Sequence, residues 1–181
     1  MSINQLEKLY REKVVPEMRR SFGYKNDLAV PRLVKAVINI GTGNATRDEK
    51  TKQAYTETLT RITGQKPVVR LARKSISSFK VRKGMAVGLS VTIRRRRLYD
   101  FVNKLVNVTL PRVRDFQGLE PKSLDGNGNL NIGFKENTVF PEIKPDEVEN
   151  IHGLEVAIVT NAKSNKEALK LFELLGFPFK K

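Results

Sequence analysis

The sequence predicts an α+β domain, with helices covering one face of a mostly antiparallel sheet and the other face left open. Two observations predict it. Segments with helical periodicity interleave with short strand-like segments at mixed spacing. The chain has 181 residues and is 39% hydrophobic, which is enough for one core of ordinary size. We therefore expect residues 1–181 to form a single domain.

The first expected elements are an amphipathic helix and a strand. Apolar side chains recur at helical spacing from Ile3 to Val14, and Pro16 should end or kink this helix near Val15. Residues 33–40 are rich in β-branched types and are followed by glycine, which is typical of a strand. Alternation should place Ala36, Ile38 and Ile40 on one face, with Lys35, Val37 and Asn39 on the other.

A second helix should follow, capped by Asn44 or Thr46 and ended by Gly64. Residues 68–71 predict a short strand after Pro67, and residues 72–84 a basic loop. Residues 85–93 give the clearest strand pattern in the chain. One face of it is apolar, and the other is small and flat, formed by Ala86, Gly88, Ser90 and Thr92.

The second half continues the same alternation. A third helix should run from about Leu98 to Pro111, and residues 111–128 should form a loop with turns at the two Asx-Gly pairs. Strands are expected at 130–134 and 155–160. The last helix should open at a capping box made by Ser164 and Glu167, and Gly176 should close it.

The charge pattern indicates the function class. Formal net charge is +15, and the 42 residues between Glu57 and Asp100 contain twelve basic residues and no acidic one. A phosphate backbone is the commonest partner for such a stretch, so we expect nucleic-acid binding. Residues 118–181 carry 8 basic and 10 acidic residues instead. This half is either a second face for a basic protein or an ordinary soluble surface.

Composition excludes other classes. The chain has no cysteine, so disulfides and thiolate chemistry are excluded. No apolar run approaches the ~20 residues that span a bilayer, and the N-terminus has no signal-peptide core. We expect a cytoplasmic protein with no membrane partner. The single histidine, His152, has no companion at metal-ligand spacing, so we expect no metal, no cofactor and no enzymatic activity.

Three segments could contact nucleic acid. The flat face of residues 85–93 lets a backbone approach closely, and its hydroxyls can donate to phosphate or ribose; an ordinary solvated face is the alternative. Arg94 to Arg97 should open a helix, where guanidinium groups and free N–H groups both attract phosphate. The loop at 73–84 either reaches a second RNA or is disordered in isolation, and Phe79 either stacks on a base or anchors the loop.

Two other functions remain open. Residues 41–46 form a glycine-containing turn between a strand and a helix, which a nucleotide-using enzyme could employ for phosphate. However, the dinucleotide fingerprint and the Gly-Lys-Ser/Thr triplet are both absent. A DNA-binding architectural protein is the other option, and the ribose 2′-hydroxyl would distinguish it.

Five segments, in order along the chain, resemble the bacterial form of the fifth large-subunit ribosomal protein family. They are residues 31–41, 63–67, 72–79, 82–84 and 153–160. The resemblance implies a ribosomal protein that binds 5S ribosomal RNA in the central protuberance, beside large-subunit ribosomal RNA. It also implies contact with peptidyl-site transfer RNA and a bridge to a protein of the small-subunit head.

The resemblance also assigns residues to these surfaces. Ribosomal RNA would be contacted by Lys35, Asn39, Gln65, Lys66, Ser90, Thr92, Arg94 and Arg95. Transfer RNA would be contacted by the loop extension at 73–84, through Arg73, Lys74, Ser75, Ser78, Lys80, Arg82 and Lys83. The bridge would use Arg112, Arg114, Asp115, Glu142 and Asp146.

Overall fold

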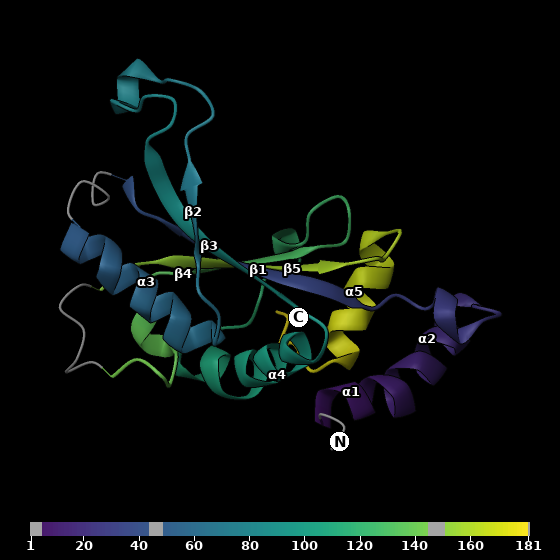
Figure 1. Cartoon of the computed structure of the whole chain (residues 1–181). Helices are drawn as coiled ribbons and strands as arrows, with labels where there is room; N and C mark the ends of the chain where they lie inside the picture. The colour runs from purple at the N-terminus through teal and green to yellow at the C-terminus, as the bar shows by residue number, and fades with distance from the viewer. Residues whose placement is uncertain (1–4, 44–48, 145–150, 181) are drawn as a thin grey trace. The chain divides into compact units, whose positions relative to one another are not determined.

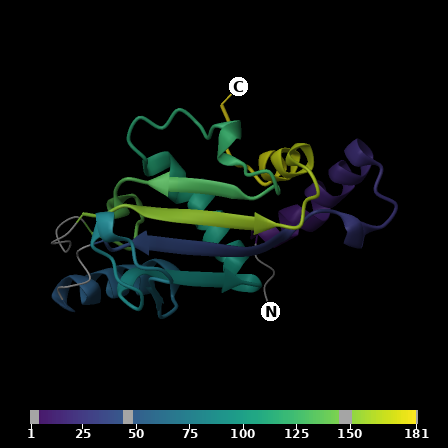
Figure 2. The ribbon, with the colours of Figure 1, turned by 90° about the horizontal axis from the view of Figure 1, so that it is seen from above.

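A computed structural model describes residues 5–43, 49–144 and 151–180 of the chain. It contains one five-stranded sheet in the order β2-β3-β1-β5-β4. The strands are β1 (Leu33–Gly41), β2 (Val68–Leu71), β3 (Ala86–Arg94), β4 (Leu130–Phe134) and β5 (Leu154–Thr160). The arrowheads of β3, β1, β5 and β4 alternate across the sheet (Figure 2), and β2 pairs with β3 in the antiparallel sense, so the sheet is antiparallel. Together with the helices, this confirms the predicted α+β class.

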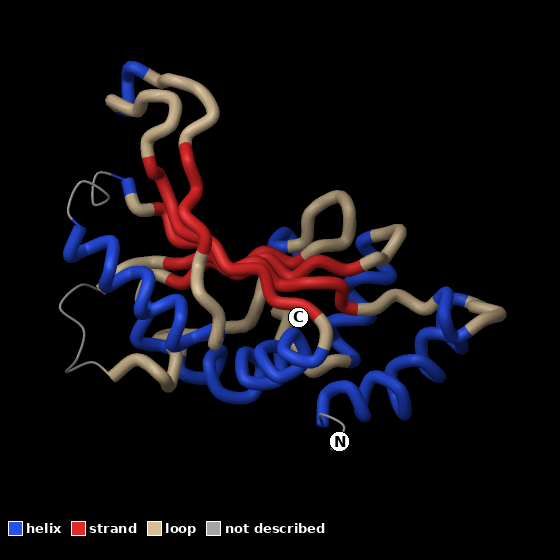
Figure 3. Tube along the Cα trace, viewed as in Figure 1, coloured by secondary structure: helices blue, strands red, loops and turns tan. Residues whose placement is uncertain are grey.

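The chain forms two compact units. Unit 1 contains residues 1–36, 93–132 and 157–181, and unit 2 contains residues 37–92 and 133–156. Unit 1 holds the helices α1 (Gln5–Leu9), α2 (Val15–Phe22), α4 (Arg96–Lys104) and α5 (Asn165–Leu174), and unit 2 holds α3 (Glu49–Thr63). Figures 1 and 3 show these elements along the chain.

The first helical segment is longer than the sequence predicts. It continues past Pro16 to Phe22, with a π-helical turn at Tyr10–Val14 between α1 and α2. Pro16 lies in the first turn of α2, where its missing N–H group costs little, so the expected end near Val15 is wrong. The Tyr10 hydroxyl donates to the carbonyl of Pro31 at 3.1 Å, and burial raises the pKa of Tyr10 to about 12.

Unit 1 has an apolar core that the helices build together. Side chains from α2, α4 and α5 are fully or almost fully buried there, among them Met18, Leu98, Val102, Leu171 and Phe172. Phe172 packs edge-on against Phe177, with ring centroids 5.1 Å apart. Burying side chains of this size is the main stabilising contribution to such a domain.

The last helix starts as predicted, with one difference. Ser164 Oγ accepts from the N–H of Glu167 at 3.3 Å, which confirms the N-cap. The Glu167 carboxylate, however, accepts from the N–H of Lys163 at 3.0 Å. The reciprocal bond is therefore made one residue before the cap, and still satisfies a backbone donor at the helix entrance.

Unit 2 builds its core mainly from buried side chains of β1, β3 and α3, whereas all four residues of β2 are exposed. Ile38 and Ile40 are fully buried and Asn39 is exposed, which confirms the predicted alternation of β1. Leu59 and Ile62 are the buried apolar side chains near the end of α3, and Gly64 follows with a φ of 66°. That left-handed conformation is the predicted helix stop. The predicted caps Asn44 and Thr46 lie outside the described residues.

Candidate nucleic-acid interface

The connection between β2 and β3 is the most distinctive part of unit 2, and we name residues 72–85 the extension. It projects from the two strands as a long arm (Figures 1 and 3). Backbone hydrogen bonds hold it together: Ala72 donates to Met85 at 2.8 Å, Gly84 donates to Ala72 at 2.9 Å, and Ile76 and Val81 bond each other at 2.8 and 3.1 Å. The predicted basic loop is therefore a hairpin-like arm held by backbone hydrogen bonds.

The tip of the extension exposes apolar side chains. A 3₁₀ turn at Ser77–Phe79 forms it and ends at Lys80, whose φ of 53° is left-handed. Phe79 is 72% exposed and Ile76 is 47% exposed. Phe79 therefore does not anchor the extension to the domain. An exposed ring at the end of a basic arm is suited to stacking on a base.

The cations of the extension are not neutralised by the fold. Arg73, Lys74, Lys80, Arg82 and Lys83 are all exposed. None of them forms an ion pair with any residue in the described ranges. In contrast, Arg61 is the first cation of the basic stretch and forms an ion pair with Glu57, with 2.7 Å between Nη2 and Oε1. Unpaired cations on a projecting arm favour binding of a polyanion.

The flat face of β3 differs from the expected open surface. Ser90 is only 4% exposed, and its hydroxyl accepts from Nε of Arg70 at 2.6 Å. Arg70 lies on β2, whose register pairs Val68 with Ser90 and Arg70 with Gly88. The predicted open position of Ser90 is therefore wrong, because the exposed side chain of Arg70 covers it. The guanidinium of Arg70 is therefore the exposed charged group next to Ser90.

Gly88 has a structural reason to be small. A Cβ atom built there would lie 2.8 Å from the carbonyl oxygen of Ile40 on the neighbouring strand. Real Cβ atoms do not approach a backbone oxygen so closely, so any side chain would push β3 away from β1. The small face of β3 is thus required in part for packing of the two strands.

The remaining predicted ribosomal RNA contacts fall in both units. In unit 2, Asn39 and Lys66 are exposed, while Gln65 and Thr92 are half-buried. The N–H of Gln65 donates to Thr63 Oγ1 at 3.2 Å, which fixes the turn after α3. In unit 1, Lys35 is half-buried, and Arg94 and Arg95 are exposed. The structure thus gathers Asn39, Gln65, Lys66, Ser90 and Thr92 in one unit, and Lys35, Arg94 and Arg95 in the other.

The four arginines occupy three different backbone settings. Arg94 ends β3, Arg95 precedes α4 with φ 57° and ψ −137°, and the helix begins at Arg96. The prediction that all four open the helix is therefore wrong for the first two. All four are exposed, and the first turn of α4 carries no acidic residue and no side-chain cap. A non-glycine residue in so sparsely populated a conformation costs about 1–3 kcal/mol.

The predicted bridge residues are also divided between the units. Unit 1 contains Arg112, Arg114 and Asp115, and all three are exposed. Asp115 has a left-handed φ of 53°. Glu142 is half-buried in unit 2. Asp146 lies outside the described residues.

His152 is held by packing within unit 2. Its ring lies 4.2 Å from that of Tyr55, with the planes tilted by 44°, and its Nδ1 is 3.4 Å from Nδ2 of Asn137. Across the ranges 5–43, 49–144 and 151–180, no group of three His, Cys, Asp or Glu side chains is placed to hold a metal ion. A search of the same ranges finds no helix with the length and apolar character to cross a membrane.

Several residues that lie beside the predicted contacts carried no signal in the sequence. Sequence patterns assigned no role to Arg70, Ser77, Val81 or Met85, the last three of which line a hollow in the extension with Ser75, Lys80 and Arg82. The basic stretch pointed to the region, but no local pattern distinguishes Arg70 from its basic neighbours. Only the register of β2 against β3 places it over Ser90.

Comparisons with known proteins cover almost the whole chain. Residues 26–82 match the family model described as ribosomal protein L5, and residues 86–179 match the model of the C-terminus of the same ribosomal family. The chain is 53% identical to "Large ribosomal subunit protein uL5" of Fervidobacterium nodosum over 97% of this chain and 96% of that protein. The protein with the same description in Thermotoga maritima is 51% identical over 97% of this chain and 96% of its own length. The one in Caldanaerobacter subterraneus is 50% identical over 99% of this chain and 100% of its own length. The chain belongs to the ribosomal protein L5 family.

Proposed function

We propose that this protein is a structural component of the large ribosomal subunit and works without catalytic turnover. It assembles there with ribosomal RNA, and its specific ligand is 5S ribosomal RNA in the central protuberance. Membership of the L5 family carries this proposal, since the relatives are described as large ribosomal subunit proteins. The exposed cations Lys66, Arg94 and Arg95 support it physically, because such groups favour binding of a polyanion.

The 5S contact would involve both units within a single RNA-binding domain. Arg94 and Arg95 supply guanidinium groups to phosphate in unit 1, and Lys35 on β1 adds an ammonium group. Asn39, Gln65, Lys66 and Thr92 offer donors in unit 2. Ser90 acts indirectly, because its hydroxyl holds the guanidinium of Arg70 at 2.6 Å. Arg70 therefore joins the proposed footprint.

The extension would contact peptidyl-site transfer RNA. The connection between β2 and β3 projects beyond the ends of these strands (Figure 1), so residues 73–83 can reach an RNA other than the one bound at the sheet. Seven of its side chains were assigned to this contact, and all seven are exposed: Arg73, Lys74, Ser75, Ser78, Lys80, Arg82 and Lys83. Basic arms of this kind gain affinity mainly from phosphate contacts, which are independent of base sequence.

A protein of the small-subunit head would complete the set of partners. Arg112, Arg114 and Asp115 form an exposed, mixed-charge turn in unit 1, and Glu142 provides an acidic group in unit 2. A basic partner would favour the acidic residues. Charge reversal by Glu142→Lys should weaken association of purified subunits more than Glu173→Lys does on α5. Equal association of the two variants would remove Glu142 from the bridge.

The principal test is binding of the full chain to 5S ribosomal RNA across a series of salt concentrations, with transfer RNA and duplex DNA as competitors. Tight binding that survives both competitors supports the proposal. Replacing Arg94 and Arg95 together with alanine should lower affinity by about 10- to 100-fold and reduce the salt slope by about two. Unchanged affinity and slope would remove these arginines from the footprint.

A matched control separates local contact from net charge. Lys163 and Lys166 are exposed near the start of α5 in unit 1, and their double alanine variant removes the same charge. It should change affinity only slightly. Replacing residues 74–83 with an Asn-Gly turn should leave 5S affinity nearly intact and remove the transfer RNA contact. A large loss of 5S affinity would reassign the extension to the 5S site.

A further inference from the structure

The extension carries an open hollow whose lining includes apolar as well as charged side chains. It has a volume of about 750 Å³ and is lined by Ser75, Ser77, Lys80, Val81, Arg82 and Met85. Pockets for small ligands commonly measure about 300–1,000 Å³, so the space is sufficient for a nucleotide. All six residues belong to the extension, so the hollow exists within unit 2 alone.

The floor of the hollow is apolar and held in place. Val81 forms both of its backbone hydrogen bonds with Ile76, at 2.8 and 3.1 Å. The Met85 sulfur accepts from the backbone N–H of Arg82 at 3.1 Å, which orients the thioether. Met85 and Val81 thus contribute a polarisable thioether and a branched aliphatic side chain to the lining, and both are favourable contacts for a planar ring. A phosphate group alone would gain no favourable contact from such an apolar surface.

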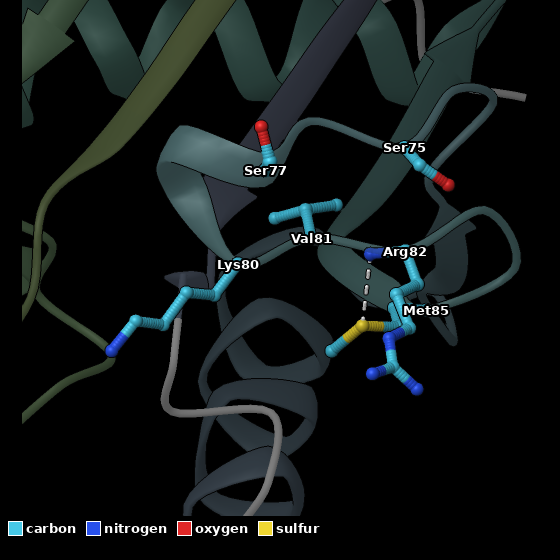
Figure 4. Close-up of a pocket in the computed structure, with 6 residues that line it drawn as sticks. All are labelled: Ser75, Ser77, Lys80, Val81, Arg82 and Met85. Atoms are coloured by element: carbon cyan, nitrogen blue, oxygen red, sulfur yellow. Dashed lines mark hydrogen bonds between the residues drawn. The ribbon is translucent and has the colours of Figure 1, made fainter.

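The polar groups lie around this floor. In Figure 4, Val81 separates Lys80 on one side from Arg82 and Met85 on the other. The Lys80 side chain extends away from Val81 (Figure 4), so its ammonium group and the guanidinium of Arg82 can reach phosphates on either side of one nucleoside of an RNA strand. Ser75 Oγ already accepts from the N–H of Lys83 at 3.0 Å, so its hydroxyl proton remains available to a ligand oxygen. Ser77 adds a second hydroxyl at the rim.

We infer that the hollow takes one unstacked RNA nucleotide, with its base against Val81 and Met85 and its flanking phosphates at Lys80 and Arg82. This deepens the proposed RNA contact of the extension and rests on it. The extension would then recognise a nucleotide turned out of its stack, which duplex phosphate contacts alone would not require. Single-stranded or looped RNA would bind it in preference to a regular helix.

The methionines allow a direct test in the full chain. The protein has three, of which Met85 lines the hollow, Met18 is fully buried in unit 1, and Met1 lies outside the described residues. Protein labelled at the methionine methyl groups with carbon-13 is titrated with adenosine 5′-monophosphate. A base over the thioether should shift the Met85 methyl signal upfield and saturate at millimolar ligand, while the Met18 signal stays unchanged.

Ribose 5-phosphate is the matched ligand, because it carries the same phosphate group and no base. It should leave the Met85 signal nearly unchanged. Equal shifts with both ligands would overturn the inference, because the base would then contribute nothing. No shift with either ligand would also overturn it. Val81→Ala, which reduces the floor without touching Met85, should weaken the adenosine monophosphate titration at least threefold.

An RNA hairpin with one looped-out adenosine provides the second readout. Replacing that nucleotide with an abasic one should weaken binding to the full chain at least fivefold. Lys80→Ala should remove this discrimination, whereas Lys166→Ala, which removes the same charge from an exposed residue of α5 outside every proposed contact, should retain it. Equal losses in the two variants would show that charge alone matters.

The two proposals fail in different ways. If the labelled protein binds 5S RNA tightly but neither probe detects a base in the hollow, the ribosomal function stands and the nucleotide site is rejected. If 5S RNA does not bind, the proposed function is rejected whatever the methyl signals show.

Discussion

Residues 72–85 in unit 2 and residues 111–129 in unit 1 are both long connections that precede a strand, but their side chains are used in opposite ways. In the second segment Leu119 and Leu124 are at most 9% exposed. Leu119 also exchanges backbone hydrogen bonds with the C-terminal residues, donating to Pro178 at 2.7 Å and accepting from Lys180 at 2.9 Å. In the first segment Ile76 and Phe79 are exposed.

The same contrast holds for charge. Asp125 in the second segment accepts from the N–H groups of Asn127 and Asn129 at 2.9 and 2.8 Å, and from the Asn129 side chain at 2.8 Å. The cations of the extension have no ionic partner in the described part of the chain. The segment 111–129 buries its apolar side chains and pairs the Asp125 carboxylate within the fold, and so stabilises the fold. The extension leaves its apolar and charged groups available, which is expected of a binding surface.

The largest effect should come from truncating an apolar side chain in each segment. Leu119→Ala should lower the free energy of unfolding by about 2–3 kcal/mol, because it removes a buried side chain and leaves a cavity. Phe79→Ala should change it by less than about 0.5 kcal/mol, because the ring is 72% exposed. Urea unfolding of the two variants measures both. A large loss in Phe79→Ala would show that the extension supports the fold.

A glycine from each segment sharpens the comparison. Gly118 and Gly84 have φ angles of 99° and 88°, so alanine is strained at both by roughly 1 kcal/mol. At Gly118 a Cβ would also lie 3.0 Å from the backbone nitrogen of Lys180, while at Gly84 it would meet nothing within 4 Å. Gly118→Ala should therefore destabilise by about 2 kcal/mol and Gly84→Ala by about 1. Equal losses in thermal unfolding would contradict the close contact.

The carboxylate of Asp125 should make the second segment sensitive to acid. Burial acts to raise its pKa, but the hydrogen bonds from Asn129 and Asn127 outweigh burial and lower the pKa below its ordinary value of 3.8. Because the folded pKa is the lower one, the contribution to stability is complete above pH ~4 and is lost as pH falls through the folded pKa.

Asp125→Ala should cost about 1–2 kcal/mol at pH 7, because three hydrogen bonds lose their acceptor. Its difference from the unchanged protein should shrink below pH ~4. Urea unfolding at about pH 7 and about pH 3 measures this. A difference that is the same at both values would mean that the charge of the carboxylate is irrelevant.

The smallest effect should come from the hydrogen bond inside the extension. Ser75 Oγ accepts from the N–H of Lys83 at 3.0 Å, and both residues are exposed. Water can replace an exposed hydrogen bond, so Ser75→Ala should change stability by less than about 0.5 kcal/mol. Thermal unfolding of both variants measures this. Ser164→Ala should lose more stability than Ser75→Ala, about 1 kcal/mol, because it removes a helix cap.

The sequence by itself determined the elements that depend on neighbouring residues. The alternation of β1, the stop at Gly64 and the cap at Ser164 follow from side-chain periodicity and local hydrogen bonding, and all three are confirmed. The basic stretch likewise identified the extension, because charge is a property of composition. The family resemblance quoted above was also visible in the sequence and is confirmed.

Only the tertiary structure decided which groups cover one another. Ser90 is buried because the register of β2 brings Arg70 over it, and Gly88 must be small because the carbonyl of Ile40 lies beside it. Pro16 continues the helical segment because the π-helical turn before it places it in the first turn of α2. The hollow in the extension arises from the pairing of Ile76 with Val81 across the 3₁₀ turn. Such contacts join residues that a local pattern cannot relate, because their distance depends on how strands and turns are aligned in space.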